Sequence, residues 1–589
     1  MTAPALGNPQ YEAHESPPLL RTLGLGAQFS LIASATLLVT PVIVADASGR
    51  GEPYVVWMVF ASLIVVGVST LIQVRRLGFI GAAATLPMFT AAFAIPFCIT
   101  AVQDGGPATL TTLLLLAAVA QIAISRWLFI LRRVVTPTVG GTVMMILSIT
   151  LASVVFDLLD DATQVTPEAA SLTAFVTMVV AAALTLRRSP LLRFWGPIAG
   201  IIVGCLVAGA LGIFDTSRVT ESAWIGLPAE YPGLGLDFGL EFWTLLPAFL
   251  FLGVIISIQA NGASISMQRV AWREDRAVDF RQMQGAVAGG GASNLLAAIG
   301  GTVPNAINPG IIAFTQITGV ASRTLGYSIG FFFILLAFLP KVSGLLSSIP
   351  GPVMTGYLIM VTGTLFVDGA RTVIQNEQNN EKIAVAGVCF WIGAAFQFKL
   401  FALPDLGPVL NAMLASGITT GGLAAVVMIL YLEFTNPRRV RFQSQLHIDA
   451  LPELNAFIAR FADSRGWDSA MKDRLSAVAE ETLLTLAPLD LEGLLAEPDD
   501  DEDDEDKEER QLIVLASSDG PVADLEFIGG GDDENMEDRL RQLQQHDSET
   551  MVEQDVSLRL LRNYASSVRH QQYHDTDIIS VTVEPPAPR

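Results

Sequence analysis

The most constraining feature of this sequence is a series of hydrophobic stretches, each close to the roughly 20 residues that a helix needs to cross a lipid bilayer. They follow one another between residues 26 and 435, with short loops between them. We place fourteen, several broken by Gly or Pro, at residues 28–47, 54–73, 80–100, 108–125, 136–157, 169–186, 194–214, 242–262, 285–302, 307–320, 324–346, 351–367, 383–398 and 408–432. Such a chain cannot bury its apolar surface as one water-soluble globule. We therefore predict an all-α polytopic membrane protein.

The charged residues are few and unevenly placed. Only 16% of the 589 residues are charged, against roughly 25% in soluble domains. A dense acidic run at residues 499–509 contributes to the formal net charge of −22 and lies far from the hydrophobic stretches. The charge thus belongs to a soluble region that follows a membrane domain, which we bound at residues 26–435.

The three cysteines, Cys98, Cys205 and Cys389, lie inside hydrophobic stretches and lack metal-ligand spacing. Packing as small apolar side chains explains them. We expect no metal, no cofactor, no nucleic-acid partner and no enzyme activity.

Residues 1–25 predict a disordered leader that stays in the cytoplasm. They are polar and Pro-rich, without the basic start and short apolar core of a cleaved signal peptide. The loops that this orientation puts inside carry most of the basic residues, as the positive-inside rule requires: Arg75, Arg76, Arg126, Arg132, Arg133, Arg187, Arg188, Arg193, Arg269, Arg273, Arg276 and Arg281. The outer loops carry only Arg50, Arg218, Lys341 and Lys399. An even number of spans then makes both termini cytoplasmic, in a protein of the inner (plasma) membrane.

No Lys, Arg, Asp, Glu or His falls near the middle of a predicted stretch. Because intramembrane ionisable groups usually mark ion and proton pathways, a carboxylate or histidine relay is disfavoured. Uncharged polar residues gather instead at 257–266 and 302–308. The amides of Gln259 and Asn261 can donate and accept hydrogen bonds together, as a planar neutral solute requires. The alternative is that they join neighbouring helices.

A Gly-rich segment at 285–301 precedes a break in the hydrophobic pattern. Its glycines permit close helix packing, and it is no nucleotide-binding loop because no soluble strand precedes it. Val303, Pro304 and Asn305 then break the helix just before a short apolar segment that begins near Ile307. A helix that starts within the membrane presents backbone N–H groups at its positive end, and secondary transporters bind substrates at such ends.

Several motifs, in order, resemble the nucleobase–ascorbate transporter family, which includes the uracil and xanthine permeases. They are residues 26–35 with Gln28, 137–142 (PTVGGT), 284–305 (QGAVAGGGASNLLAAIGGTVPN), 319–323 (GVASR) and 349–356 (IPGPVMTG). The match runs through most of residues 26–435. It implies fourteen spans in two inverted repeats of seven, folded as a core domain and a gate domain, and a homodimer.

The resemblance also implies a substrate site in the core domain, between half-helices of the third and tenth spans. Phe93 matches an aromatic residue that stacks on the base in the family, although packing against lipid or protein is the alternative. With the polar clusters, the expected substrate-binding residues are Phe93, Gln259, Asn261, Asn305, Ile307 and Asn308.

The sequence departs from the family where acids are expected. Gln259 and Ala263 replace two acids of the eighth span, Gly290 replaces one in the ninth, and Ile307 stands ahead of Asn308 where the tenth span has Glu or Gln. The resemblance implies a secondary transporter of nucleobase-like solutes, of the uracil, xanthine or urate class. Facilitated diffusion then becomes an alternative to proton symport. A bicarbonate- or sulfate-type anion permease of related fold is the second candidate.

Residues 441–589 predict a small cytoplasmic α+β domain. Helices are expected at 451–462 and 471–486, strands at 511–516 and 523–528, a helix near 556–568 and a last strand at 577–584, with a disordered acidic loop at 497–510. The order resembles the anti-sigma type of histidine-kinase-like ATPase domain.

That ATPase family holds magnesium with a Glu and, four residues later, an Asn. In this chain the residue four positions after Glu480 is Leu484, and the one four positions after Glu481 is Thr485. We therefore expect a regulatory tail that binds a cytoplasmic protein. The third candidate function is a transporter-derived sensor that signals through this tail.

Overall fold

The computed structural model describes residues 9–127, 136–165, 167–214, 220, 223–228, 233, 235–274, 276–376, 380–401, 406–407, 410–411, 414, 416–435, 439–486, 511–529, 536–537, 560–573 and 576–585. The chain divides into two compact units, which we call the membrane unit (residues 1–275 and 282–432) and the tail unit (residues 276–281 and 433–589). The predicted acidic loop at 497–510 and the first eight residues of the leader lie outside the described residues.

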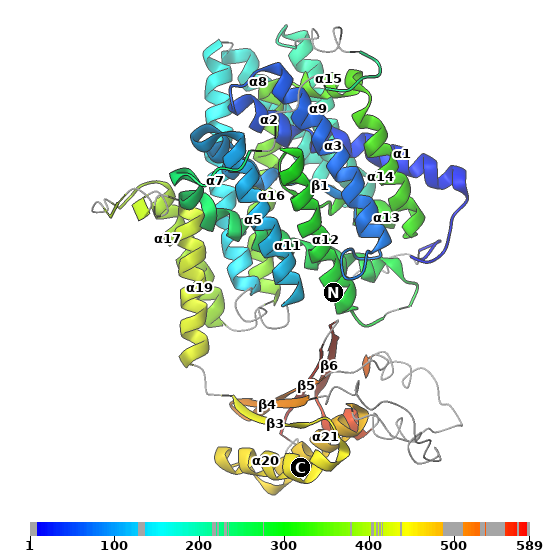
Figure 1. The fold of residues 1–589 in the computed structure, drawn as a ribbon, viewed down its shortest axis with the longest axis vertical. Coiled ribbons are helices and arrows are strands. Elements are labelled where there is room, and N and C mark those ends of the chain that lie inside the picture. The colour runs from blue at the N-terminus through cyan, green and yellow to red at the C-terminus, as the bar shows by residue number, and fades with distance from the viewer. Residues whose placement is uncertain are drawn as a thin grey trace. The chain divides into compact units, whose positions relative to one another are not determined.

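The membrane unit is a bundle of apolar helices (Figure 1). Its first half contains α1 (Leu19–Leu37), α2 (Val39–Ala47), α3 (Glu52–Arg75), α4 (Ile95–Thr100), α5 (Gly106–Arg126), α7 (Pro137–Val165), α8 (Pro167–Thr185) and α9 (Pro190–Ala210). Its second half contains α11 (Leu240–Ala271), α12 (Phe280–Gly300), α13 (Gly310–Thr318), α14 (Arg323–Ala337), α15 (Pro340–Ser347), α16 (Gly351–Asn376), α17 (Asn380–Gln397) and α19 (Gly417–Thr435). Within the described ranges, six helical segments are long and apolar enough to span a bilayer by themselves.

Prolines mark where several of these helices begin. Pro53, Pro107 and Pro190 stand in the first turn of α3, α5 and α9. The missing N–H of proline costs nothing there, because the first N–H groups of a helix have no partner within it. The hydrophobic runs after these three prolines form helices at the second, fourth and seventh predicted stretches.

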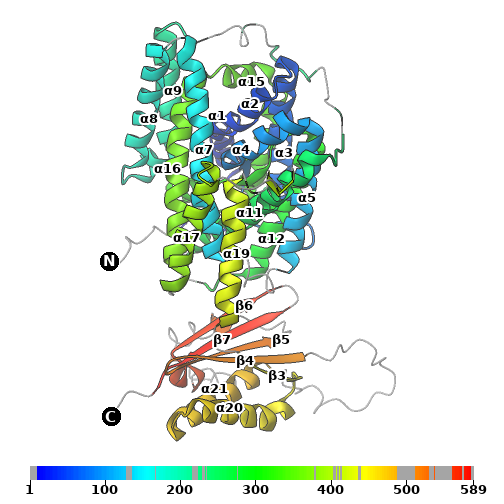
Figure 2. The ribbon, with the colours of Figure 1, turned by 90° about the vertical axis from the view of Figure 1, so that its left-hand side faces the viewer.

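The helices of the membrane unit pack in two groups. In the first, α14 packs on both α1 and α3, while α5 packs on α11. In the second, shown in Figure 2, α7 packs on α16, α8 packs on α9, and α17 lies against α7. Helices α4, α11 and α13 touch members of the second group. The two groups therefore meet along these three helices, and α1 also touches α9.

Four of the predicted stretches are not single helices in the described residues, and in the first of them residues 28–47 are divided between α1 and α2. Residues 80–100 hold a short strand, β1 (Met88–Thr90), a 3-10 helix, η1 (Ala92–Ala94), and then α4. Residues 307–320 start in the strand β2 (Asn305–Ile307), which precedes α13, and residues 324–346 form the two helices α14 and α15. Hydrophobic length alone did not reveal these breaks, because buried strands and helices can be equally apolar.

The leader is ordered from residue 9, which corrects the prediction of a disordered segment to residue 25. Helix α1 already begins at Leu19. Residues 9–15, here called the N-terminal strap, are hydrogen bonded to two distant parts of the membrane unit. Pro9 and Ala13 are buried. Polar groups of the strap thus have protein partners.

The tail unit is a five-stranded antiparallel sheet with two helices on one face (Figure 2). Its elements are β3 (Val440–Gln445), η3 (Ile448–Ala450), α20 (Leu451–Arg465), α21 (Ser469–Leu486), β4 (Gln511–Asp519), β5 (Val522–Gly529), β6 (Ser567–Gln572) and β7 (Asp577–Val583). The strand order is β3-β4-β5-β7-β6. In β5 buried and half-buried residues alternate, so that Leu525 and Phe527 pack in the same core as Leu454 and Leu475 of the helices.

The tail contains the two long helices and the strands that the sequence predicts, and two strands that it does not. Strand β3 lies at one edge of the sheet and β6 at the other. The predicted helix near 556–568 is wrong at its end, because residues 567 and 568 belong to β6; the structure describes a helix only at 560–564. Both missed strands are polar, as edge strands can be.

Candidate functional site

One short strand from each half of the membrane unit forms the framework of the candidate site. β1 and β2 pair antiparallel, with Met88 opposite Ile307 and Thr90 opposite Asn305. Each strand leads at once into a helix, β1 into η1 and α4, and β2 into α13. The third and tenth hydrophobic stretches therefore both contain a helix that begins inside the stretch, as the break at Pro304 predicts for the tenth.

Asn305 is fully buried and supports the break from the side of α12. Its backbone N–H donates to Asn294 Oδ1 over 2.6 Å, and its side-chain amide donates to Ser293 Oγ over 3.1 Å. The Asn294 amide in turn donates to Gln121 Oε1 over 2.9 Å. This buried network joins α5, α12 and β2, so Asn305 holds the framework.

Asn308 lies at the start of α13 and is half-buried. Its Oδ1 accepts the N–H of Gly310 over 2.8 Å, and its own N–H donates to the Pro87 carbonyl over 2.9 Å. The side-chain oxygen is thus committed to the first turn of α13. The NH2 group of this amide can still donate to a solute.

Gln259 and Asn261 are both half-buried on α11 but are not brought together. Two residues along an α-helix correspond to about 200° around its axis. The two amides therefore point to nearly opposite sides of α11. Asn261 lies nearer the side that faces α5, where a Cβ at Gly253 would be 3.3 Å from the Ala117 carbonyl oxygen.

The neighbours of Gln259 show where its side chain points. Ile258 packs on α7, since a Cβ at Gly140 would lie 2.2 Å from Ile258 Cδ1. Ala263 lies in a buried cluster with Ile307 of β2. At about 100° per residue, Gln259 falls between these two directions. Its amide thus occupies the sector of α11 between the strand pair and α7.

The two apolar residues of the predicted site have different surroundings. Phe93 belongs to η1, directly after β1, and is 8% exposed. The η1 segment touches α7 and α16 of the second helix group. Ile307 packs with Met88, Ala260 and Ala263 and so seats β2 against α11. Phe93 stands where the two helix groups meet, whereas Ile307 is part of the packing beneath the strands.

Polar side chains outside the predicted site residues hold the Gly-rich helix. Gln73 on α3 donates to the Ala286 carbonyl over 2.9 Å and accepts the N–H of Ala82 over 3.1 Å. A Cβ at Gly289 would lie 2.6 Å from Gln73 Oε1. Gln73 and Gln121 were visible as amides within or beside apolar stretches, and this was the available signal.

The assembled arrangement is polar but carries no charge. Residues 85–100, 255–268 and 285–318 contain no Asp, Glu, Lys, Arg or His. Around the strand pair lie the start of α13, the amide of Gln259 and the ring of Phe93. The first N–H groups of α13 are bonded to Asn308 and Pro309. Such a site can hydrogen bond a neutral planar solute, and its positive helix end can also attract a small anion.

Known proteins identify the family of the membrane unit. The model of the xanthine/uracil permease family, described as "Permease family", matches residues 20–400. The chain belongs to this family of nucleobase permeases. The resemblance drawn from the sequence motifs is thereby confirmed. This permease is accordingly a multi-pass membrane protein.

The alignments of this permease with curated relatives cover almost the whole length of each relative. It is 28% identical to the xanthine permease XanP of Escherichia coli (strain K12) over 447 residues, which is 71% of this chain and 94% of the relative. It is 25% identical to the nucleobase transporter PlUacP of Paenibacillus larvae, over 69% of this chain and 94% of the relative. The solved transmembrane domain of the cyanobacterial bicarbonate transporter BicA is 16% identical, with a TM-score of 0.46, over 71% of this chain and all of that one.

The space beside Gly290 is filled in this permease by a neighbouring amide. A Cβ at Gly290 would lie 2.7 Å from Gln121 Nε2. The Gln121 side chain is fully buried and also bonded to Asn294. The space beside position 290 is therefore occupied by an uncharged hydrogen-bonding group.

Proposed function

We propose that this permease is a secondary transporter of nucleobase-like solutes, of the uracil, xanthine or urate class, across the inner membrane. The observation that carries the proposal is the position of Gln259, between the paired strands and α7, in a chain of the nucleobase permease family. A primary amide presents a donor and an acceptor side by side, which complements the polar edge of a purine or pyrimidine. Its relatives include xanthine permeases of Escherichia coli, which supports the same substrate class.

Within this site we assign separate roles to the predicted residues. Gln259 bonds the solute, Phe93 stacks on its ring, and the NH2 group of Asn308 contributes a further donor beside the start of α13. Asn305 and Ile307 support β2 through their bonds and packing. Asn261 lies on the other side of α11 and serves helix packing.

The proposed architecture has fourteen spans in two inverted repeats of seven. The core domain comprises α1 to α5 and α11 to α15, and the gate domain comprises α7 to α9 and α16 to α19. The pairing of β1 with β2, one from each repeat, supports this arrangement. The strap bonds to the segments that follow α11 and α13, so the N-terminus and these two loops share one side of the membrane. The arginine distribution makes that side the cytoplasm, and we expect a homodimer.

Transport in this permease proceeds by facilitated diffusion. The positions where the family resemblance expects acids hold Gln259, Ala263 and Gly290. Without a carboxylate to take up and release a proton, the site offers no carrier for proton coupling.

Proteoliposomes loaded with the full chain test both parts of the proposal. Uptake of labelled xanthine, uracil and urate is measured with and without a pH gradient. We expect saturable equilibration of at least one base and no accumulation driven by the gradient. Absence of saturable uptake of all three would sink the substrate class, whereas gradient-driven accumulation would sink facilitated diffusion alone.

A bicarbonate- or sulfate-type anion is the second candidate substrate. The observation in its favour is the absence of acidic side chains from the segments around the strand pair, together with the positive end of α13. Anion flux that saturates and is indifferent to added xanthine would favour it. Competition between the two solutes would instead assign the flux to the nucleobase site.

We propose that the tail unit regulates transport or signals its state to a cytoplasmic protein. Its own sheet and hydrophobic core support a separate role. Deletion of residues 441–589 is expected to leave basal uptake intact. If the deletion abolishes uptake in correctly inserted protein, the tail belongs to the transporter itself.

A further inference from the structure

The N-terminal strap is hydrogen bonded along the connection between α13 and α14. The N–H of Tyr11 donates to the Gly319 carbonyl over 3.0 Å, and the Tyr11 carbonyl accepts the N–H of Ala321 over 2.9 Å. The Ala13 carbonyl accepts the N–H of Arg323 over 3.1 Å. The strap thus runs as a short parallel partner of this connection, beside the end of the half-helix α13.

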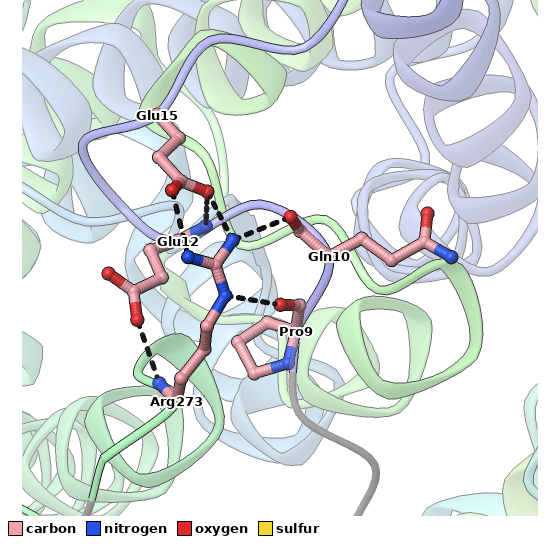
Figure 3. A network of polar contacts seen from close by, with 5 residues as sticks. All are labelled: Pro9, Gln10, Glu12, Glu15 and Arg273. Carbon is pink, nitrogen blue, oxygen red and sulfur yellow. Dashed lines mark hydrogen bonds and ion pairs between the residues drawn. The ribbon is translucent and has the colours of Figure 1, made fainter.

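Arg273, two residues beyond the end of α11, binds the strap from the other side (Figure 3). Its guanidinium donates to the Pro9 and Gln10 carbonyls over 3.2 and 2.8 Å, and to both carboxylate oxygens of Glu15 over 2.9 and 2.7 Å. Its backbone N–H donates to a carboxylate oxygen of Glu12 over 2.9 Å. One arginine therefore gathers four residues of the strap.

Packing fits the strap to these two partners. Ala13 is 7% exposed and lies in a buried cluster with Ala271 of α11 and Ala321. Gly319 ends α13 in the left-handed conformation, with φ of 67°, and a Cβ there would lie 3.2 Å from Gln10 Cγ. Glycine at this position thus serves both the end of α13 and the seat of the strap.

The contacts act as a set. A single exposed ion pair contributes roughly 1 kcal/mol or less, and both side chains of the Arg273–Glu15 pair are 41% exposed. The guanidinium, however, also orders two backbone carbonyls, and the strap backbone continues into three further bonds with residues 319–323. Bidentate geometry and shared ordering make such a network stronger than its separate pairs.

We propose that the strap, through Arg273, is a positioning element for transport. It fixes the C-terminal end of α11 relative to the C-terminal end of α13. Because α11 contains Gln259 and Asn308 directly precedes α13, the strap sets the distance between the two sides of the substrate site. The strap is a permanent brace and stays bound while substrate is carried. The effect of the strap on substrate affinity rests on the proposed function, whereas its restraint of the two helices does not.

The hold on the helices is tested by hydrogen–deuterium exchange on the purified full chain in lipid nanodiscs. In Arg273→Gln we expect the amides of residues 319–323 and 270–274 to exchange about tenfold faster or more. The matched control is Arg269→Gln, which removes an exposed arginine from the last turn of the same helix. Wild-type exchange in Arg273→Gln, or equal acceleration in the control, would overturn the brace.

The effect on the site is tested by uptake of labelled xanthine. Arg273→Gln is expected to raise the apparent KM by about 3- to 30-fold, with unchanged amounts of protein in the membrane and little change in kcat. Arg273→Lys should recover part of the loss, since an ammonium can still bond Glu15 but cannot reach all the partners of a guanidinium. An unchanged KM despite faster exchange would make the strap merely structural. If the wild type carries no nucleobase, the proposed function fails while the exchange experiment still stands.

A cross-link separates a permanent brace from a latch that must open. Cysteines replacing Tyr11 and Val320, which face each other in the pairing, are joined by mild oxidation. We expect uptake by the oxidised and reduced forms to be equal. Loss of uptake on oxidation, restored by reductant, would show that the strap has to leave and would overturn the proposal.

Discussion

The N–H group of Gly81 donates a hydrogen bond to the carbonyl oxygen of Gly285 over 2.8 Å, so the chain that leads to β1 lies directly on α12. A Cβ at position 285 would come within 2.1 Å of the Gly81 carbonyl oxygen. Backbone atoms cannot rotate away as a long side chain can. The approach of the two segments therefore depends on glycine at position 285.

Gly285→Ala is expected to destabilise the membrane unit by roughly 1–3 kcal/mol, because the added methyl group must push the two backbones apart. The change is measured as a lower midpoint of thermal unfolding in nanodiscs. Gly387→Ala on α17 is the matched control, since a Cβ there meets nothing within 4 Å. Equal midpoints for the two variants would mean that the contact is loose.

Asn294→Ala should weaken the break that precedes α13. It removes the acceptor of the Asn305 N–H and the donor to Gln121, leaving buried polar groups without partners. Each such group costs roughly 1–3 kcal/mol. We expect a lower unfolding midpoint together with a raised KM, whereas Gln316→Ala, which removes an exposed amide from α13, should change neither. A normal midpoint in Asn294→Ala would speak against the network.

Gln259→Ala and Asn261→Ala remove similar amides from opposite sides of α11. Because a substrate edge bonded in a dry site is left unpaired when its partner is removed, we expect Gln259→Ala to raise the apparent KM by about tenfold or more. Asn261→Ala should alter stability more than affinity. The reverse pattern, measured by uptake and thermal unfolding, would move the site to the α5 side of α11.

The strap is expected to respond to acid through Glu15. The Arg273 hydrogen bonds, and then the Glu12 N–H, hold the pKa of this carboxyl below its ordinary value of 4.5. Since the folded pKa is the lower one, the stabilising contribution is complete above pH 4.5 and is lost as the pH falls through the folded pKa. Exchange protection of residues 319–323 should therefore stay constant from neutral pH down to 4.5 and decline below it. A decline already near pH 6.5, the ordinary pKa of histidine, would assign the response to His14 instead.

His570 and Asp577 form a buried pair in the tail unit, with side chains 3% and 2% exposed and Nε2 3.5 Å from Oδ2. His570 Nδ1 accepts the N–H of Met536 over 3.0 Å, so Nε2 carries the hydrogen that faces Asp577. His570→Ala leaves a buried carboxylate alone and should destabilise the tail by roughly 3–5 kcal/mol. Limited proteolysis of the full chain measures this. His447→Ala, whose partner Asp449 is 86% exposed, should leave the cleavage rate near that of the wild type.

The sequence predicts which segments form the site better than it predicts where their side chains point. The break at Pro304 and the close packing of residues 285–301 follow from local rules, because proline ends a helix and glycine admits a neighbour. The spacing of Gln259 and Asn261 already implies opposite faces of a helix, but which face looks at the strand pair depends on contacts with Gly140 and Ile307. Those contacts join positions more than forty residues apart.

The strap is an ordered segment that its local sequence pattern does not predict. Pro9, Glu12 and Glu15 have the composition of an unstructured leader, and the distant Arg273 bonds to all three. Similarly, β3 and β6 are held by β4 and β7, while their own sequences are polar. For the strap and for β3 the partner is remote in the chain, whereas β6 pairs with the strand that follows it.

The partners of the strap also set an order of events during synthesis. Residues 9–15 leave the ribosome early, but Arg273 and residues 319–323 are made more than 250 residues later. The strap must therefore wait, unpaired, while the intervening helices enter the membrane. Its docking is a late step of biogenesis, and an undocked N-terminus marks a permease whose core is unfinished.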